Sequence, residues 1–232
     1  MKKKIGILGG ISHTSTIKYY QTIMNLYYER FGNYYYPEII IHSLDFQYFT
    51  DLENELKLQE YEDYIVYSIH CLENAGADFI IMAANSPHSV LSNVIKRACI
   101  PILSIVDAVG VEAQKKNLKK LLLTGIKYTM QSDFYKSGMR KYGIEVITPN
   151  DAEQNLINQI IFQELVLDNM LDKSRENFLE IINRYPADGV ILGCTELPLL
   201  LDNKDTRIRL LNSLNLHCEM ALNYALCDSS RT

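Results

Sequence analysis

The sequence predicts an α/β fold, because short runs rich in β-branched residues alternate with longer amphipathic segments along the whole chain. The short runs are continuously apolar, which is typical of parallel strands covered by helices on both faces. An internal repeat divides this alternation into two similar halves. We therefore expect two pseudo-symmetric, doubly wound domains with parallel sheets and an interdomain cleft.

The expected strands and helices follow from these runs and from the 3.6-residue period of the segments between them. Strands are expected at residues 4–8, 38–42, 79–83, 100–104, 120–124, 145–148 and 189–193. Helices are expected at residues 16–30, 59–74, 106–115, 130–141, 154–168 and 173–185. A final helical segment, residues 207–226, is expected to return to the first half.

The repeat is clearest at an offset of 110, where residues 77–84 (ADFIIMAA) match residues 187–194 (ADGVILGC). Two further matches keep the same order, residues 4–9 with 120–125 and residues 38–40 with 145–147. Together they predict an N-terminal domain of residues 1–100 plus 210–232 and a C-terminal domain of residues 101–209.

Composition excludes several classes of protein. The 232 residues are 47% hydrophobic and 22% charged with a net charge of −5, which is typical of a folded protein and not of a nucleic-acid binder. The apolar run at residues 79–84 is far shorter than the roughly 20 residues that cross a membrane. The five cysteines form no Cys-x-x-Cys pair, so we expect free thiols and a cytoplasmic protein. The histidines and cysteines lack metal-ligand spacing, and no metal is expected.

Ligands of parallel α/β sheets bind at the carboxyl ends of the strands. Two repeat-related strands end in Ala84-Asn85-Ser86 and in Cys194-Thr195-Glu196, and we expect both ends to line the cleft. Amide groups and a helix start at Cys194 would favour a reactive thiolate. The alternative is a buried structural cysteine, but the polar residues that follow Cys194 favour a site.

Three other segments carry candidate binding groups. Residues 9–16 (GGISHTST) follow the first strand and could cradle an anion, although a glycine turn with a capping hydroxyl also explains them. Asn85, Ser86 and His88 follow the third strand and could bind a second polar group or only cap a helix. Thr129 is either a further carboxylate donor or a cap. No nucleotide-binding motif is present.

Nearly the whole chain resembles the cofactor-independent aspartate/glutamate racemase superfamily, and most closely its L-aspartate/glutamate-specific branch. The resemblance is carried in order by residues 7–12 (ILGGIS), 15–16, 19–20, 42–46 (HSLDF), 85–88 (NSPH), 125, 128–130, 133–135, 157–162 and 193–196 (GCTE). It implies two α/β domains, usually in dimers, that remove and return the α-proton of an amino acid without pyridoxal phosphate. Two thiols on opposite faces of the α-carbon perform this reaction in the family.

The sequence departs from the family at the first of these thiols. Cys194 matches the second, but Ala84 occupies the first position, and the repeat independently pairs Ala84 with Cys194. A methyl group has no proton that it can exchange with a substrate. The chain therefore either represents a natural subfamily with another mechanism or carries an introduced substitution. The neighbouring Ala83 and Pro87 favour a natural motif. Some aspartate racemases bind the side-chain carboxylate of the substrate with an Arg and a Lys. Near the corresponding positions this chain has Gln47 and Val166, and Lys127 is a candidate replacement cation.

The leading hypothesis is an aspartate/glutamate racemase-like enzyme, active as a homodimer on a small amino acid and without a cofactor. Cys194 would be the acid/base on one face, and a water, Ser86 or His88 would serve the other. The expected substrate-binding residues are Ser12, Thr16, Asn85, Ser86, Thr129, Thr195 and Glu196. One alternative is a single-thiol reaction such as decarboxylation of a malonate-type acid. The other is a catalytically silent amino-acid-binding protein.

Overall fold

The computed structural model describes residues 2–167 and 169–227, and the chain forms two compact units. Unit 1 comprises Met1–Ile105 together with His217–Thr232, and unit 2 comprises Val106–Leu216. The expected helix end at Asp168 and the expected domain limits at residues 1 and 232 lie outside the described residues.

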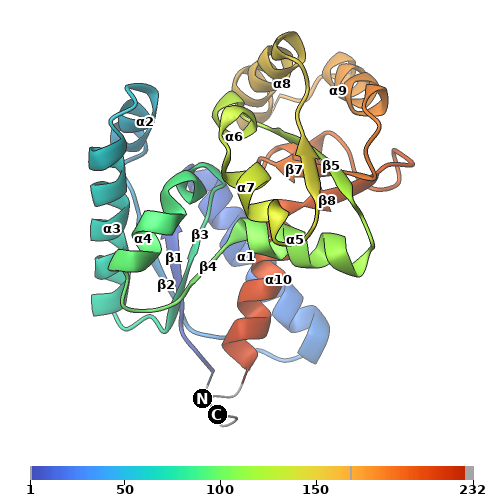
Figure 1. Cartoon of the computed structure of the whole chain (residues 1–232). Coiled ribbons are helices and arrows are strands. Elements are labelled where there is room, and N and C mark those ends of the chain that lie inside the picture. Colours follow the sequence, from blue (N-terminus) through green and yellow to red (C-terminus); the bar gives the residue numbers. More distant parts are fainter. Residues whose placement is uncertain (1, 168, 228–232) are drawn as a thin grey trace. The chain divides into compact units, whose positions relative to one another are not determined.

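Unit 1 is built on a four-stranded parallel sheet in the order β2-β1-β3-β4 (Figure 1). Its strands are β1 (Ile5–Gly9), β2 (Ile39–Ser43), β3 (Phe79–Met82) and β4 (Ile102–Leu103). The connecting helices are α1 (His13–Phe31), α2 (Phe46–Asn54), α3 (Leu58–Asn74), the 3₁₀ turn η1 (Ser86–Val90) and α4 (Leu91–Arg97). Helix α10 (Ser213–Leu226) belongs to unit 1 from His217 onward.

Alternation along the strands decides which helix covers each face of this sheet. Leu8, Ile80 and Met82 point to the face covered by α3, where they pack with Ile65 and Ile69. Phe79 faces the other way, where its ring contacts that of Tyr224 in the C-terminal part of α10. Both faces are therefore buried, as the continuously apolar strands predicted.

Unit 2 repeats the same topology with a parallel sheet in the order β6-β5-β7-β8. Its strands are β5 (Lys120–Gly125), β6 (Glu145–Ile147), β7 (Gly189–Gly193) and β8 (Arg209–Asn212). The helices are α5 (Ile105–Lys115), α6 (Lys127–Gln131), α7 (Phe134–Arg140), α8 (Asp151–Gln163) and α9 (Asp172–Arg184), with 3₁₀ turns η2 (Leu165–Leu167) and η3 (Leu197–Leu199). Helices α8 and α9 lie on one side of the sheet and α5 on the other (Figure 1).

The Ala-Asp pair that opens the sequence repeat has the same structural role in both units. Asp78 accepts a hydrogen bond from the backbone N–H of Lys4 at 2.6 Å, so it ties the start of β3 to β1. Asp188 accepts from the N–H groups of Lys119 and Lys120 at 2.7 and 2.8 Å, at the start of β5. These amide donors lower the pKa of the Asp188 carboxyl.

Two expected elements differ from the structure. The single helix expected at residues 130–141 is two helices, because Ser132 has extended backbone angles and Asp133 then starts α7. The segment expected to be helical from residue 207 begins instead with strand β8, which pairs with β7. Strand β8 has only two apolar residues, Leu210 and Leu211, and so short a run inside a longer helical pattern does not distinguish a strand from a helix by its period.

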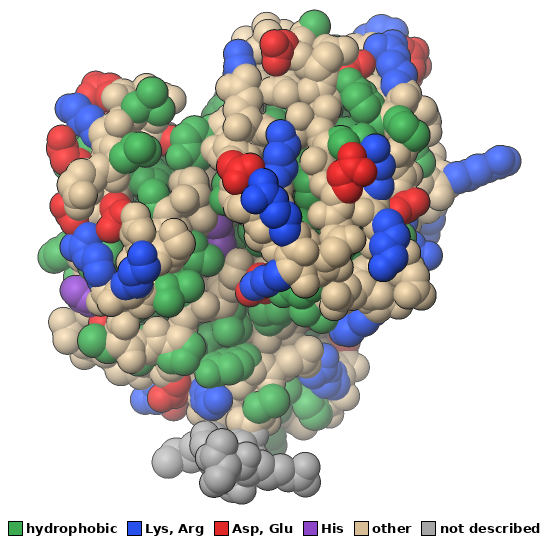
Figure 2. Space-filling model, viewed as in Figure 1, with side chains coloured by type: hydrophobic (Ala, Val, Ile, Leu, Met, Phe, Trp, Pro, Cys, Tyr) green, Lys and Arg blue, Asp and Glu red, His purple; other side chains and the backbone are tan. Residues whose placement is uncertain are grey.

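The α/β class with two four-stranded parallel sheets is therefore confirmed. Within residues 2–167 and 169–227, no helix is both long and apolar enough to cross a bilayer. Basic and acidic side chains are interspersed over the face seen in Figure 2, which agrees with the mixed charge of the sequence.

Candidate functional site

Cys194 follows directly after strand β7 of unit 2 and is half-buried. Its Sγ donates a hydrogen bond to Oε2 of Glu196 at 2.9 Å, and the Thr195 hydroxyl donates to the same oxygen at 2.6 Å. The Glu196 side chain is itself buried. The strand thus ends in a thiol, a hydroxyl and a carboxylate joined by hydrogen bonds, which we call the unit 2 strand end.

The environment of Cys194 keeps its thiol protonated. Burial raises the pKa of Cys194 well above its ordinary value, and the neighbouring Glu196 carboxylate raises it further. Hydrogen bonds from the backbone N–H groups of Glu196 and Thr195 lower the pKa of Cys194, but their effect is smaller than that of burial and of the carboxylate. The expected thiolate stabilisation by a helix start is absent here, because the following turn η3 is only three residues long.

Thr129 lies in the short helix α6, beside the same strand ends. Its side chain is fully buried, and its hydroxyl has no hydrogen-bond partner within the described part of the chain. Strands β5 and β7 approach closely beside it, since a Cβ at Gly125 would lie 2.8 Å from the Gly193 carbonyl oxygen and one at Gly193 would lie 2.7 Å from the Thr124 carbonyl oxygen. A buried hydroxyl without a partner costs about 1–3 kcal/mol, so Thr129 destabilises this part of unit 2 relative to an apolar side chain of the same shape.

In unit 1, Ser12 lies in the loop between β1 and α1, and Thr16 lies near the start of α1. Ser12 caps helix α1, and its hydroxyl lies 2.6 Å from that of Thr14. The Thr16 hydroxyl accepts from the Gly10 N–H at 2.8 Å and donates to the Ser12 carbonyl at 2.9 Å. The Thr16 hydroxyl therefore serves the loop itself, and Ser12 is the more available of the two for a ligand.

Glycine is required in this loop at two positions. Gly10 has a φ of +86°, and a Cβ there would lie 2.4 Å from the backbone nitrogen of Leu44. A Cβ at Gly9 would lie 2.5 Å from a methyl carbon of Thr16. The close approach of the loop to its neighbours thus explains both glycines without a nucleotide.

Ala84, Asn85 and Ser86 follow strand β3, and all three are buried. The loop after β1 is joined to this strand end, because Ser15 donates its hydroxyl to the Ala83 carbonyl at 2.5 Å. Ser86 is hydrogen-bonded to the carboxyl group of Glu53, which also accepts from the Tyr61 hydroxyl at 3.1 Å. Burial raises the pKa of Glu53, although both hydroxyl donors oppose the shift. We call residues 84–86 the unit 1 strand end.

His88 is fixed as a neutral side chain that braces the backbone. Its Nδ1 lies 3.1 Å from the Ala84 carbonyl, and its Nε2 accepts from the Ile105 N–H at 3.1 Å. Burial, reinforced by the nearby His217, lowers the pKa of His88 to about 3. Since both ring nitrogens are engaged, His88 is unsuited to proton transfer with a substrate.

The residues considered for the side-chain carboxylate are all exposed. Lys127 donates through Nζ to Asn155 at 2.9 Å, and Gln47 donates to Asp51 at 2.8 Å. Val166 lies in the turn η2 and carries no polar group. In residues 2–167 and 169–227, no group of three His, Cys, Asp or Glu side chains is arranged to hold a metal ion.

The geometry brings together the predicted residues of each strand end, but several partners were not expected. Glu53 was missed because no helix was predicted over α2, so nothing marked it as a neighbour of Ser86. Tyr61 lies within the helix predicted at residues 59–74, but without Glu53 it had no assigned partner. His217 has no role assigned to it from the sequence, yet it lies 3.0 Å from the Tyr19 hydroxyl and 3.0 Å from the Leu103 carbonyl. A long-range partner of this kind leaves no local pattern in the sequence.

The family model described as Asp/Glu/Hydantoin racemase matches residues 8–221, which is most of the chain. The chain belongs to this racemase family. The match includes both strand ends, so Cys194 and Ala84 occupy repeat-related positions within a racemase-family chain.

Solved structures agree with the family assignment. A protein assigned provisionally as an Asp/Glu racemase from Yersinia pestis is 32% identical, with a TM-score of 0.91 and coverage of 97% of this chain and 100% of that one. An aspartate racemase homologue from Pyrococcus horikoshii OT3 is 38% identical, with a TM-score of 0.86 and coverage of 96% and 99%. Glutamate racemase from Persephonella marina is 26% identical over 61% of this chain, and the match spans only 56% of that racemase.

Proposed function

We propose that this racemase-family protein acts without a cofactor on the α-carbon of aspartate or glutamate, with Cys194 as the proton-transfer group on one face. The observation that carries the proposal is the 2.9 Å hydrogen bond from the Cys194 thiol to the buried Glu196 carboxylate, at the carboxyl end of a parallel strand. Membership of the Asp/Glu/Hydantoin racemase family supports the substrate class.

The chemistry assigned to Cys194 is the exchange of one proton with the substrate. Glu196 accepts the thiol proton, and the thiolate then takes the α-proton, so that an S–H bond forms as the C–H bond breaks. The electron pair left on carbon delocalises into the substrate carboxylate. Hydroxyl and amide donors from Ser12, Asn85, Thr129 and Thr195 are proposed to stabilise that charge, and Thr129 is the best supported because its buried hydroxyl has no other partner among the described residues.

The opposite face of the substrate is assigned to the unit 1 strand end, where Ala84 offers no proton. Of the groups considered there, His88 is neutral and engaged at both nitrogens. Ser86 remains, and its hydrogen bond to Glu53 supplies a carboxyl group that can replace a lost hydroxyl proton. Because an alkyl hydroxyl is a far weaker acid than a thiol, we expect exchange on the Cys194 face to be much faster than full racemisation.

Proton NMR of L- and D-aspartate and of L- and D-glutamate in deuterated water tests this proposal. We expect the α-proton of one enantiomer to be replaced by deuterium with retention of configuration, and the other enantiomer to react more slowly. Cys194→Ala should reduce that exchange by about 10²–10⁴-fold, the usual contribution of one acid/base group. Cys99→Ala, which removes an exposed thiol in unit 1, is the matched control and should exchange like the wild type.

The alternatives give different results in the same experiment. Exchange that persists in Cys194→Ala would refute the role of this thiol. Saturable binding of an amino acid with no exchange in the wild type would show a silent binding protein, the third hypothesis from the sequence.

One observation favours a second function, the decarboxylation of a malonate-type acid. The raised pKa of Cys194 keeps the thiol protonated, and a protonated thiol is what a carbanion left by loss of carbon dioxide requires. Such a reaction needs only one proton, so Ala84 would be no obstacle. Release of carbon dioxide from phenylmalonate, abolished in Cys194→Ala but not in Cys99→Ala, would favour this function over amino-acid exchange.

We also propose that the protein is a homodimer, and the aromatic segment after α1 is the surface that supports it. Tyr34 and Tyr35 are 75% and 78% exposed, and Tyr34 stacks on Tyr28 with ring centroids 5.4 Å apart. Exposed clustered tyrosines are typical of protein interfaces. Light scattering on the wild type and on a Tyr34→Ser/Tyr35→Ser variant tests this, with a monomeric variant as the expected result. A monomeric wild type would contradict it.

A further inference from the structure

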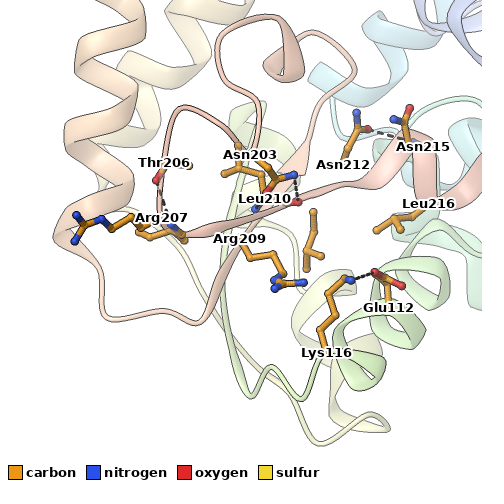
Figure 3. A pocket seen from close by; sticks show the side chains of 12 residues that line it. Glu112, Lys116, Asn203, Thr206, Arg207, Arg209, Leu210, Asn212, Asn215 and Leu216 are labelled. Carbon is orange, nitrogen blue, oxygen red and sulfur yellow. Dashed lines mark hydrogen bonds and ion pairs between the residues drawn. The ribbon is translucent and has the colours of Figure 1, made fainter.

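Unit 2 contains a pocket that involves none of the strand-end residues. It lies beside the edge strand β8, the loop before that strand and helix α5, and has a volume of about 460 Å³ (Figure 3). Its polar lining includes Glu112 and Lys116 from α5, Arg207 and Arg209 at the start of β8, and Asn212 and Asn215 at its end. We call it the Arg209 pocket.

The charged end of the Arg209 pocket lies away from the carboxyl ends of the strands. Arg209 pairs in register with Gly189, the first residue of β7, whereas Cys194 follows the last residue of that strand. A ligand in this pocket would therefore occupy a different place from the substrate proposed for Cys194. Its binding can be measured independently of any exchange activity.

Positive charge is concentrated in this pocket. Three basic side chains and one carboxylate line it, although the chain as a whole carries a net charge of −5. Glu112 is engaged with Lys116 at 2.9 Å, and within residues 2–167 and 169–227 no carboxylate forms an ion pair with Arg207 or Arg209. In Figure 3 the Arg209 guanidinium points toward the Lys116 ammonium, and Arg207 points away from it.

Lys116 is already paired with Glu112, whereas no carboxylate within residues 2–167 and 169–227 pairs with Arg209, so an anion beside the Arg209 guanidinium would gain an attraction that the protein does not satisfy. The guanidinium of Arg209 suits an oxyanion, because its paired N–H groups match two oxygens of a phosphate or carboxylate. Asn212 accepts from the Asn215 N–H at 3.1 Å through its side-chain oxygen, which leaves its NH₂ group as a further donor.

The walls of the Arg209 pocket are held in place by local hydrogen bonds. The Asn203 carboxamide pairs with the backbone of Leu210, accepting from its N–H at 2.9 Å and donating to its carbonyl at 3.4 Å. Thr206 accepts from the Ile208 N–H at 3.2 Å. The aliphatic side chains of Ile208 and Leu216 also line the pocket. A volume of this size is typical of sites for small organic ligands.

We propose that the Arg209 pocket binds a small phosphomonoester, with Arg209 and Lys116 holding the phosphate group and the aliphatic wall contacting an apolar remainder. A phosphate carries up to two negative charges near neutral pH, so it matches the excess of positive charge better than a single carboxylate does.

Titration calorimetry with phenyl phosphate tests the proposal on the intact protein. We expect saturable binding that weakens with added salt, and a loss of about tenfold or more in affinity in Arg209→Gln and in Lys116→Gln. Arg140→Gln, which removes an exposed arginine of unit 2 outside the pocket, should bind like the wild type. All three substituted side chains are exposed, and circular dichroism checks that each variant folds.

Other probes separate the remaining outcomes. Inorganic phosphate should bind more weakly than phenyl phosphate, because it lacks the apolar part, and benzyl alcohol should not bind. Equal affinity in Arg209→Gln and the wild type would overturn the proposal, as would tighter binding of the tricarboxylate citrate than of phenyl phosphate. Absence of saturable phenyl phosphate binding at millimolar concentrations would also overturn it.

Discussion

The two strand ends share a topology but differ in chemistry. In unit 2, β7 leads into Cys194 and Glu196, whose side chains are hydrogen-bonded to each other. In unit 1, β3 leads into Ala84, and the polar groups that follow are engaged with neighbouring parts of the protein: Ser86 with Glu53, and His88 with the backbone. Each sheet has the same strand order, so the fold alone does not distinguish them.

The difference shows that the fold and the chemistry of a repeat are separable. The aspartates at the start of β3 and β7 tie the strands together in both units, whereas a thiol follows the strand only in unit 2. The unit 1 strand end keeps hydrogen bonds that stabilise its own loop, and unit 2 keeps a buried hydroxyl, that of Thr129, with no partner among the described residues. We therefore expect substitutions at the unit 2 strand end to lower activity and a thiol placed at the unit 1 strand end to raise it.

The largest effect is expected from restoring a thiol to unit 1. Ala84→Cys should raise the rate of full racemisation by about 10²–10⁴-fold, because both faces of the α-carbon would then meet a thiol. Chiral chromatography of aspartate and glutamate after incubation measures the product. Ala84→Ser is the matched control, since a hydroxyl of similar size is a much weaker acid. An Ala84→Cys variant that folds but still exchanges only one enantiomer would contradict the assignment of residue 84.

His88 should make unit 1 sensitive to acid. The pKa of His88 is lowered from 6.5 to about 3, and burial is the largest cause. Between these pH values the unfolded chain binds a proton at His88 and the folded chain does not. The stability contributed by neutral His88 is complete above pH 6.5 and is lost as the pH falls toward 3. The loss reaches about 1.4 kcal/mol per pH unit and roughly 5 kcal/mol in total.

Urea denaturation at several pH values measures this dependence. The slope of unfolding free energy against pH between 6.5 and 4 should be shallower in His88→Asn than in the wild type, whatever the absolute stability of the variant. His70→Asn, which changes an exposed histidine of the same unit, should keep the wild-type slope. Equal slopes in His88→Asn and the wild type would show that His88 is not the buried neutral group.

Glu196→Gln should make Cys194 more reactive toward iodoacetamide. The Glu196 carboxylate raises the pKa of the thiol, so its removal increases the thiolate fraction at neutral pH and shifts the alkylation profile to lower pH. Mass spectrometry of the peptide that contains Cys194 separates it from the other four cysteines. Glu145→Gln, at an exposed carboxylate paired with Lys120, should leave the profile unchanged. An upward shift in Glu196→Gln would contradict the electrostatic role of the carboxylate.

The smallest effect is expected from two buried threonines of unit 2. Thr124 donates its hydroxyl to the Ile191 carbonyl at 2.8 Å, so Thr124→Val should cost about 1 kcal/mol or more of stability. Thr129→Val removes a hydroxyl without a partner in the described residues and should leave stability unchanged or slightly higher, while it weakens substrate binding. Thermal melts and substrate titrations measure the two effects. Equal destabilisation by both substitutions would mean that Thr129 has a partner in the folded protein.

Most of the fold was predictable because its signals are local. Continuous apolar runs identified seven of the eight strands, and the repeat identified equivalent strands in the two units. Strand β8 was not predicted, because its four residues lie next to a strongly helical segment and are fixed as a strand only by pairing with β7. The break between α6 and α7 likewise depends on the backbone angles of Ser132, which the periodicity does not encode.

The candidate site divides in the same way. The sequence by itself determined the α/β class, the presence of Cys194 and Glu196 at a strand end, and the presence of Ala84 at the repeat-related position. Only the tertiary structure decided the protonation of Cys194, the neutrality of His88 and the pairing of Ser86 with Glu53. The physical reason is that residue identity and strand position are local properties, whereas pKa values depend on burial and on charges brought close by distant parts of the chain.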